Sequence, residues 1–274
     1  MKMRHLLIVL SLGAIGWATS CKSEFERIRA SGDPTAMYVK ATDYYDKGEY
    51  QKAQALYELV ISSYRGRKEA EDISYRYAYT YYHLGQYILA AYYFKNFVQT
   101  FGASTKREEA DYMAAYSNYQ LSPTFRLDQS YTVSAIEGFQ VFVSTYPQSE
   151  KVADCNRLID EMRKKLERKA YEEANLYFDL RNYQSAIQTY ENLLKDYPET
   201  DNAERVRYMI ARSAYLLAVN SFVEKQESRF REAINYSTEF LERYPKSEFK
   251  NEVSSFYDNS RKKLKQLTNV GYQN

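Results

Sequence analysis

Few side chains in this sequence could perform catalysis or hold a metal ion. Beyond residue 20, His83 is the only histidine, and the only cysteines are Cys21 and Cys155. One histidine and one internal thiol cannot form a His/Cys metal site or an internal disulfide. There is no P-loop, no glycine-rich dinucleotide fingerprint and no nucleophile elbow, and none of the many possible carboxylate pairs stands out. We expect no cofactor, no metal and no enzyme activity, and we expect Cys155 to be a small core residue on a helix.

Tyrosine is the abundant functional side chain, with 30 copies in 274 residues. Several tyrosines recur at spacings i, i+4 and i+7, which place side chains on one helix face. Such a face offers rings for stacking and hydroxyls for hydrogen bonds, and it suits an extended peptide with aromatic side chains. The alternative is that these rings fill the space between repeats. The predicted peptide-binding set, called the tyrosine stripe, is Tyr38, Tyr45, Tyr75, Tyr79, Tyr82, Tyr112, Tyr116 and Tyr119.

The helices that carry the stripe belong to a repeated sequence pattern. Gly48, Tyr50 and Ala53 are followed by Tyr57, and the same pattern returns at Gly85. A glycine that ends one helix, an aromatic residue and a small alanine in the next are typical of a tetratricopeptide repeat. Later copies of the alanine and aromatic pair are Ala90 with Phe94, Ala135 with Phe139, Ala186 with Tyr190, and Ala233 with Phe240.

The repeats predict an all-α solenoid of about five tetratricopeptide-like helix pairs and a C-terminal capping helix. Three repeats close on Tyr-Pro-x-Ser/Thr, in which proline stops one helix and the hydroxyl residue can cap the next. The expected repeats are 34–64, 69–101, 106–147 with a long internal loop at 122–129, 151–198, and 200–245 with an interruption near 224–229. The capping helix is expected at 247–267, with a basic outer face formed by Arg261, Lys262 and Lys265.

The first residues form a targeting signal. Lys2 and Arg4 precede an apolar run from Leu6 to Ala18, which is too short to span a bilayer as a finished helix. Small residues then precede Cys21, as in a bacterial lipobox, so we expect lipid on Cys21 and a membrane anchor. An ordinary secretory signal is the alternative. The predicted segments are a signal peptide at 1–20, a lipidated tether at 21–33, an N-terminal half of repeats 1–3 at 34–147, and a C-terminal half of repeats 4–5 and the capping helix at 148–274.

The body has balanced charge. Loss of Lys2 and Arg4 with the signal leaves 36 Lys and Arg against 36 Asp and Glu. A nucleic-acid-binding protein would show a basic excess, so we expect no nucleic acid partner.

The stripe stops in the second half of the chain. Asn175 and Arg212 stand where the earlier repeats have Tyr79 and Tyr116. Two halves with different faces suggest two partners. The predicted partner interface of the C-terminal half consists of Asn175, Glu204, Arg205 and Arg212.

The combination of a lipobox, a short tether and five such repeats resembles the BamD (YfiO) family of outer-membrane lipoproteins. The most specific matching segments are 139–149, 174–186 and 193–198. The resemblance implies a periplasmic scaffold, anchored in the outer membrane, of the β-barrel assembly (BAM) machinery. It implies that the N-terminal repeats receive unfolded outer-membrane proteins through a C-terminal signal ending in an aromatic residue. It further implies that the C-terminal repeats bind the periplasmic domains of the barrel component. The loop at 122–129 and the high tyrosine content depart from the commonest pattern.

Two other functions use the same features. The tyrosines could stack on sugars in a glycan-binding lipoprotein, although Trp17 is the only tryptophan and lies in the signal. The repeats could also form a general periplasmic adaptor that is unrelated to barrel assembly.

Overall fold

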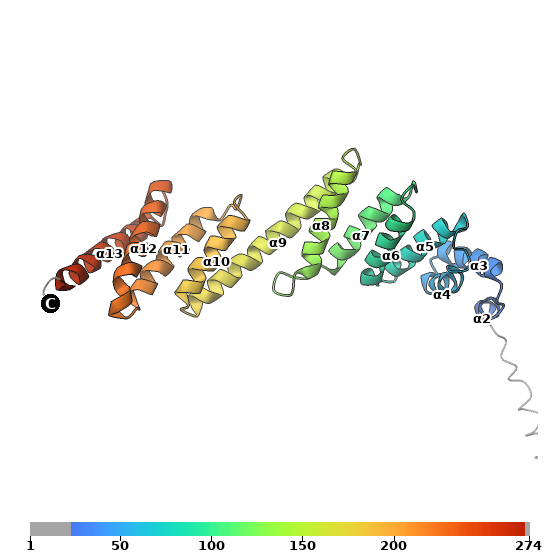
Figure 1. Ribbon diagram of the computed structural model, residues 1–274, viewed down its shortest axis with the longest axis horizontal. Coiled ribbons are helices and arrows are strands. Elements are labelled where there is room, and N and C mark those ends of the chain that lie inside the picture. Colours follow the sequence, from blue (N-terminus) through green and yellow to red (C-terminus); the bar gives the residue numbers. More distant parts are fainter. Residues whose placement is uncertain (1–22, 272–274) are drawn as a thin grey trace, which may run out of the picture. The chain divides into compact units, whose positions relative to one another are not determined.

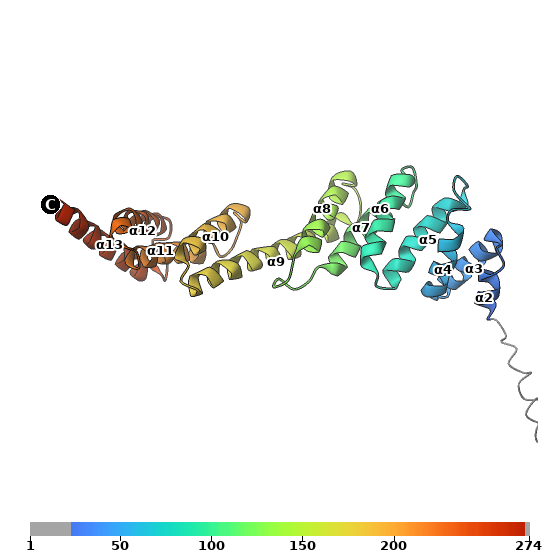
Figure 2. The same ribbon diagram turned by 60° about the horizontal axis from the view of Figure 1, so that its bottom comes forward.

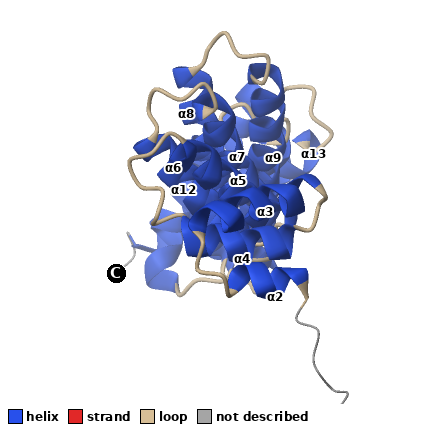
Figure 3. Cartoon of the chain, turned by 90° about the vertical axis from the view of Figure 1, so that its right-hand side faces the viewer, coloured by secondary structure: helices blue, strands red, loops and turns tan. Residues whose placement is uncertain are grey.

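The structure is a computed structural model that describes residues 23–271 (Figure 1). Within this range the chain forms helices joined by turns and loops, with no strand (Figure 3). This confirms the predicted all-α class. The helices are α2 (Glu24–Arg29), α3 (Pro34–Asp46), α4 (Tyr50–Val60), α5 (Glu69–His83), α6 (Tyr87–Thr100), α7 (Arg107–Leu121), α8 (Ser130–Thr145), α9 (Val152–Asp179), α10 (Tyr183–Asp196), α11 (Ala203–Val219), α12 (Val223–Arg243) and α13 (Lys250–Gly271).

These helices form the expected sequence of pairs. The pairs are α3 with α4, α5 with α6, α7 with α8, α9 with α10 and α11 with α12, followed by the capping helix α13. The described chain divides into two compact parts, here called the N-terminal body (23–122 and 131–155) and the C-terminal body (123–130 and 156–271). The proposed functional division at residue 147 remains a prediction.

The turns inside the first pairs use the glycines that the repeat pattern singles out. Gly48 and Gly85 have φ angles of 75° and 71°, in the left-handed region that costs glycine little. Arg181 occupies the corresponding turn between α9 and α10 with a φ of 60°, and it is the one described residue other than glycine with positive φ. The turn geometry is therefore retained where the glycine is absent.

Predicted capping residues lie at the start of α3 and in the turns just before α9 and α11. Asp33 accepts a hydrogen bond from the Thr35 N–H at 2.9 Å, and Pro34 is the first helical residue of α3. Ser149 accepts from the Lys151 N–H at 3.2 Å, and Thr200 accepts from the Asn202 N–H at 3.1 Å. The hydroxyl residue of the Tyr-Pro-x-Ser/Thr phrase thus organises the start of the next pair.

The same hydroxyls also connect successive repeats. Ser149 Oγ donates to Glu108 Oε1 at 2.6 Å, and Thr200 Oγ1 donates to Glu167. Ser104, which lacks the preceding Tyr-Pro, donates to Glu71 Oε1 at 2.6 Å. Each carboxylate lies on the first helix of the preceding pair, so one short polar side chain both orders the turn before its own helix and bonds to the neighbouring repeat. The sequence pattern predicts Thr200 as the N-cap of α11, but Asn202 occupies that position.

The repeated alanine and aromatic residues form the core of each body. In the N-terminal body Ala53, Tyr57, Ala90 and Phe94 are fully buried. In the C-terminal body the equivalents Ala186, Tyr190, Ala233 and Phe240 are 0–1% exposed. A buried large side chain of this kind contributes about 3–5 kcal/mol when judged by truncation to alanine, so these positions hold the pairs together.

Two sequence expectations need correction. Residues 24–29, expected within a polar tether, form helix α2, because Phe25 and Ile28 pack against the N-terminal core and Ser23 caps the helix. The helix interruption expected near 224–229 is absent, because these residues belong to the continuous helix α12. Gln226 Nε2 donates to the Ser221 carbonyl at 3.0 Å, and this bond joins the first turn of α12 to the preceding turn.

The predicted anchor, Cys21, lies outside the described residues. No described helix has the length and apolar character needed to cross a bilayer.

Candidate functional site

The tyrosine stripe lies on the first helices of the first three pairs, α3, α5 and α7. All eight side chains are partly buried. Most of them form a continuous ring series in the N-terminal body. Tyr82 connects α5 to α7, since its ring centroid lies 6.3 Å from that of Tyr116. Along α7, Tyr116 lies 5.5 Å from Tyr112 and 5.6 Å from Tyr119.

His83 connects this ring series to α3, and sequence analysis did not assign it to the site. Its ring centroid lies 6.3 Å from Tyr45 and 5.8 Å from Tyr79. It also stacks on Tyr50 at 4.1 Å with an interplanar angle of 12°. His83 is exposed overall, but partial desolvation lowers its pKa below the usual value, which favours the uncharged imidazole at neutral pH. Its position four residues after Tyr79 was the available sequence signal.

Three stripe tyrosines hold neighbouring repeats together through their hydroxyls. Tyr79 donates to Glu109 Oε1 at 3.0 Å, and Tyr112 donates to Asp154 Oδ2 at 3.1 Å. Tyr38 donates to Asp72 Oδ2 at 3.5 Å. Burial, followed by nearby carboxylates or hydroxyls, raises the pKa of each of these tyrosines, so the phenols remain donors. The alternative structural role therefore applies to part of the stripe.

Lysines reinforce two of these junctions. Lys106 Nζ lies 2.8 Å from Asp72 Oδ1 and 4.9 Å from the ring centroid of Tyr75. Lys151 Nζ lies 3.1 Å from Glu109 Oε2 and 4.5 Å from the ring centroid of Tyr112. Cation–π contact and ion pairing at one junction favour a fixed spacing between repeats.

The remaining stripe residues are better placed to meet a ligand. The hydroxyls of Tyr45, Tyr82 and Tyr116 form no hydrogen bond with a described residue. Burial raises the pKa of Tyr45 and Tyr82, which keeps both phenols neutral. With His83, these residues give a series of neutral rings across three repeats, and the Arg76 guanidinium lies 5.0 Å from the Tyr45 ring centroid. Tyr38 is not part of this series, because its ring packs on Tyr64, which lies outside it, and its hydroxyl bonds to Asp72.

A second candidate site lies in the C-terminal body, between α9 and α11. A groove of about 500 Å³ brings together Asn175, Arg205 and Arg212, three of the four predicted interface residues. The fourth, Glu204, lines a different groove beside the turn at 243–248. Aromatic residues Tyr171 and Phe178 also line the first groove, and sequence analysis did not select them.

Two of these predicted interface residues have structural partners. Asn175 Oδ1 accepts from Tyr190 OH at 2.5 Å. Arg212 lies 3.8 Å from Glu252, donates to Tyr208 OH at 3.3 Å and covers the Phe178 ring at 5.3 Å. Arg205 is exposed and has no ion pair with a described residue. Arg205 is therefore the cation of this groove best placed to meet a partner.

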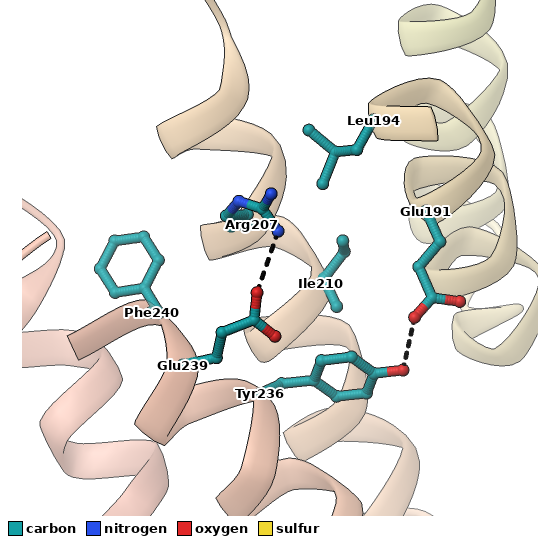
Figure 4. A pocket seen from close by; sticks show the side chains of 7 residues that line it. All are labelled: Glu191, Leu194, Arg207, Ile210, Tyr236, Glu239 and Phe240. Atoms are coloured by element: carbon teal, nitrogen blue, oxygen red, sulfur yellow. Dashed lines mark hydrogen bonds and ion pairs between the residues drawn. The ribbon is translucent and has the colours of Figure 1, made fainter. Parts of the chain in front are cut away.

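A smaller cavity of about 170 Å³ lies between α10, α11 and α12 (Figure 4). Leu194, Ile210 and Phe240 supply its apolar wall. The polar groups at the cavity are paired with one another. Arg207 Nη1 lies 3.1 Å from Glu239, and Tyr236 donates to Glu191 at 2.7 Å (Figure 4). Arg207 Nε is buried and has no hydrogen-bond partner among the described residues, so the pairing at the cavity is incomplete.

The long loop between α7 and α8 packs on α9 within the C-terminal body. Lys169 Nζ donates to the carbonyl oxygens of Phe125 and Leu127 at 3.3 and 2.9 Å. The guanidinium of Arg168 lies 4.3 Å from the Phe125 ring centroid. The loop thus contributes to a packed surface.

Reactive chemistry is not evident in the described part of the chain. No group of three or more His, Cys, Asp or Glu side chains there could hold a metal ion. Cys155 is fully buried, as expected, and burial followed by the neighbouring Asp154 raises its pKa to about 11.

Within the described residues, five helix pairs with buried alanines and a C-terminal capping helix define a tetratricopeptide-type scaffold. The sequence matches the model of the YfiO family, described as an outer membrane lipoprotein, over residues 30–215 and 182–268. The chain therefore belongs to the YfiO (BamD) family of outer membrane lipoproteins. Comparison with curated proteins found no match.

Similar solved structures include two tetratricopeptide domains and one further protein. The TPR2AB domain of yeast Sti1 in a pHSP90 complex is 13% identical, with 83% of this chain and 98% of that chain covered and a TM-score of 0.40. The MamA protein is 17% identical, with 78% and 92% covered and a TM-score of 0.31. The P58(IPK) TPR domain is 15% identical, with 88% and 66% covered and a TM-score of 0.40.

Proposed function

We propose that this lipoprotein is a non-enzymatic, outer-membrane-anchored scaffold on the periplasmic face that binds unfolded outer-membrane proteins and a barrel component of the assembly machinery. Family membership supports the lipoprotein scaffold. The observation that carries the substrate-binding part is the uncharged ring series, which crosses three repeats through Tyr45, His83, Tyr82 and Tyr116.

The ring series suits capture and later release of many precursors. Each aromatic pair contributes about 0.5–1.5 kcal/mol beyond area burial, so several modest contacts give useful affinity without one obligatory partner residue. Neutral rings stack on the aromatic side chains of an extended peptide whatever the intervening residues are. Binding and hand-over need no covalent step.

We assign the contact with the barrel component to the groove between α9 and α11. Arg205 is exposed there and can pair with a carboxylate of a periplasmic domain, while Tyr171 and Phe178 provide apolar contact. Arg212 holds Phe178 and Tyr208 in place. Arg205→Glu is accordingly a cleaner test of this contact than a change at Arg212.

Peptide binding by the full chain tests the first role. The probes are a C-terminal peptide of an outer-membrane β-barrel ending in an aromatic residue, its scrambled form, and a panel of glycans. Tyr82→Ala with Tyr116→Ala should weaken peptide binding about tenfold, because two ring contacts are lost. Tyr92→Ala is the matched control, since Tyr92 is 57% exposed on α6 and outside the ring series.

The outcomes separate the candidate ligands. The proposal predicts retained helicity in both variants, weaker peptide binding only in the double variant, and no glycan binding. Unchanged peptide affinity in a folded double variant would refute the assignment. Glycan binding that depends on Tyr82 and Tyr116 would instead support a sugar-binding lipoprotein.

A further inference from the structure

A groove between α12 and α13 is not used by either proposed role. It lies in the C-terminal body, where the first half of α12 contacts the second half of α13, and the two helices lie side by side in both views (Figures 1 and 2). Its volume is about 470 Å³. The lining residues are Arg231, Ile234, Tyr257, Arg261, Leu264, Lys265 and Thr268.

The groove has a basic rim. Arg231, Arg261 and Lys265 line it, and no acidic residue does. Arg231 pairs with Glu227 at 2.8 Å, whereas Arg261 and Lys265 have no carboxylate partner among the described residues. Residues 259–271 contain four cationic side chains and no acidic one. This positive charge is local, because the chain without its predicted signal has 36 Lys and Arg against 36 Asp and Glu.

Cations near a helix C-terminus also compensate the helix dipole, which accounts for a basic run without any ligand. That explanation does not require the cations to border an apolar floor. Here Ile234 and Leu264 lie within the groove, both partly buried, and the Tyr257 ring lies beside them. The arrangement therefore combines charge with an apolar contact surface.

Arg261 is held in a defined position. Its guanidinium lies 5.5 Å from the Tyr257 ring centroid, and Nη1 donates to Tyr257 OH at 3.4 Å. A guanidinium beside an aromatic ring keeps further N–H donors available for a carboxylate, which it can bind in a bidentate manner. Lys265, one helical turn along, supplies a second cation.

We propose that the groove between α12 and α13 binds an acidic peptide segment of a partner protein, with carboxylates on Arg261 and Lys265 and an apolar side chain on Ile234 and Leu264. Charge complementarity favours an acidic ligand. Ile234 and Leu264 lie beside the cations, so an acidic peptide with an apolar side chain can contact both at once. This surface is separate from the ring series and from the groove between α9 and α11.

Fluorescence anisotropy with the detergent-purified full chain tests the proposal. The probe is a labelled peptide of sequence Asp-Glu-Leu-Asp-Glu-Phe-Asp-Glu, and the control peptide replaces Leu and Phe by Ser. Arg261→Glu with Lys265→Glu should weaken binding about tenfold or more, because two charge-assisted contacts become repulsive. Lys262→Glu with Lys263→Glu is the matched control, since it makes the same charge change on α13 outside the groove.

The expected result is a loss confined to the groove variant and weaker binding of the Ser-containing peptide by the unmodified chain. Circular dichroism should show equal helicity for all variants. Equal losses in both charge-reversal variants would overturn the proposal, since they would indicate general electrostatic attraction. The last measurement is binding of the same variants to vesicles of phosphatidylcholine with phosphatidylglycerol. Vesicle binding that depends on Arg261 and Lys265, without peptide binding, would also overturn it in favour of a lipid surface.

Discussion

At the scale of single residues, most functional side chains also stabilise the repeats. Tyr79 and Tyr112 belong to the predicted tyrosine stripe, yet their hydroxyls bond to carboxylates of the next repeat. Tyr82 and Tyr116 lack such bonds to described residues and are the better candidates for ligand contact. The hydrogen bonds therefore separate the tyrosines that hold repeats together from those whose hydroxyls can meet a ligand.

Arg181 gives a direct test of turn strain. Its φ of 60° falls where glycine is favoured, and a non-glycine residue there costs about 1–3 kcal/mol. Glycine loses more conformational freedom on folding, which offsets part of the gain. Arg181→Gly should therefore raise the free energy of unfolding by about 0.5–1 kcal/mol in urea denaturation. Gly85→Ala is the reverse control and should lower it. A destabilised Arg181→Gly would show that the arginine side chain outweighs the backbone cost.

Cys155 provides a chemical test of burial. Its thiol is fully buried, and its raised pKa of about 11 leaves little thiolate at pH 8. Alkylation of the folded chain at this site should be about 100-fold slower than in urea, as followed by mass spectrometry against Cys155→Ala. Equal rates in the folded and unfolded chains would contradict a closed core at this position.

At the scale of helices, close contacts between helix pairs depend on small residues. A Cβ atom added to Gly138 of α8 would lie 2.8 Å from Ala115 Cβ and 3.2 Å from Ala115 Cα of α7. These atoms cannot move without a shift of the helix. The sequence pattern identified the recurring alanines but gave no reason to single out Gly138, since the clash depends on the distance between two helices.

Replacement of Gly138 by alanine tests this contact. Alanine improves helix propensity by about 1 kcal/mol, whereas overpacking costs about 1–3 kcal/mol. We expect net destabilisation of about 1 kcal/mol in thermal or urea unfolding. Ala115→Gly in the same chain should relieve the clash, and Ser134→Ala, at an exposed position of α8, should be nearly neutral. A Gly138→Ala variant more stable than the parent would refute the close approach.

Helix content and pairing were predictable from the sequence because the repeat pattern recurs with its turn glycines and Tyr-Pro-x-Ser/Thr phrases. The left-handed turn at Arg181 was not, since nothing in an arginine indicates positive φ. The helix at 24–29 was missed because Phe25 and Ile28 are only two apolar residues in a polar segment, and their contacts with the core come from distant sequence. His83 was set aside as a lone histidine, although ring spacing makes it part of the site.

At the scale of the whole molecule, the tyrosine content has a consequence for stability at high pH. Burial raises the pKa of Tyr57 to about 12, and burial with the Asp111 carboxylate raises that of Tyr146 to about 12. The unfolded value is about 10. The folded chain retains protons that the unfolded chain releases, so this stabilisation is complete below pH 10 and is lost as the pH rises toward 12.

We therefore predict cooperative alkaline unfolding between about pH 10 and 12. Circular dichroism and tyrosinate absorbance, recorded on the same samples, should show helix loss together with ionisation of the buried phenols. Complete tyrosine ionisation near pH 10 with unchanged helicity would contradict the burial described for these side chains.

The central claim is that the chain is a scaffold for barrel assembly, and its partners test this most directly. Full-length, C-terminally tagged protein should be purified from mildly solubilised outer membranes, with co-purifying proteins identified and quantified by mass spectrometry. The account predicts a large barrel protein with periplasmic domains in near-equal amount, and its loss with Arg205→Glu. Recovery of sugar-uptake proteins instead, or of no stoichiometric partner, would contradict the account.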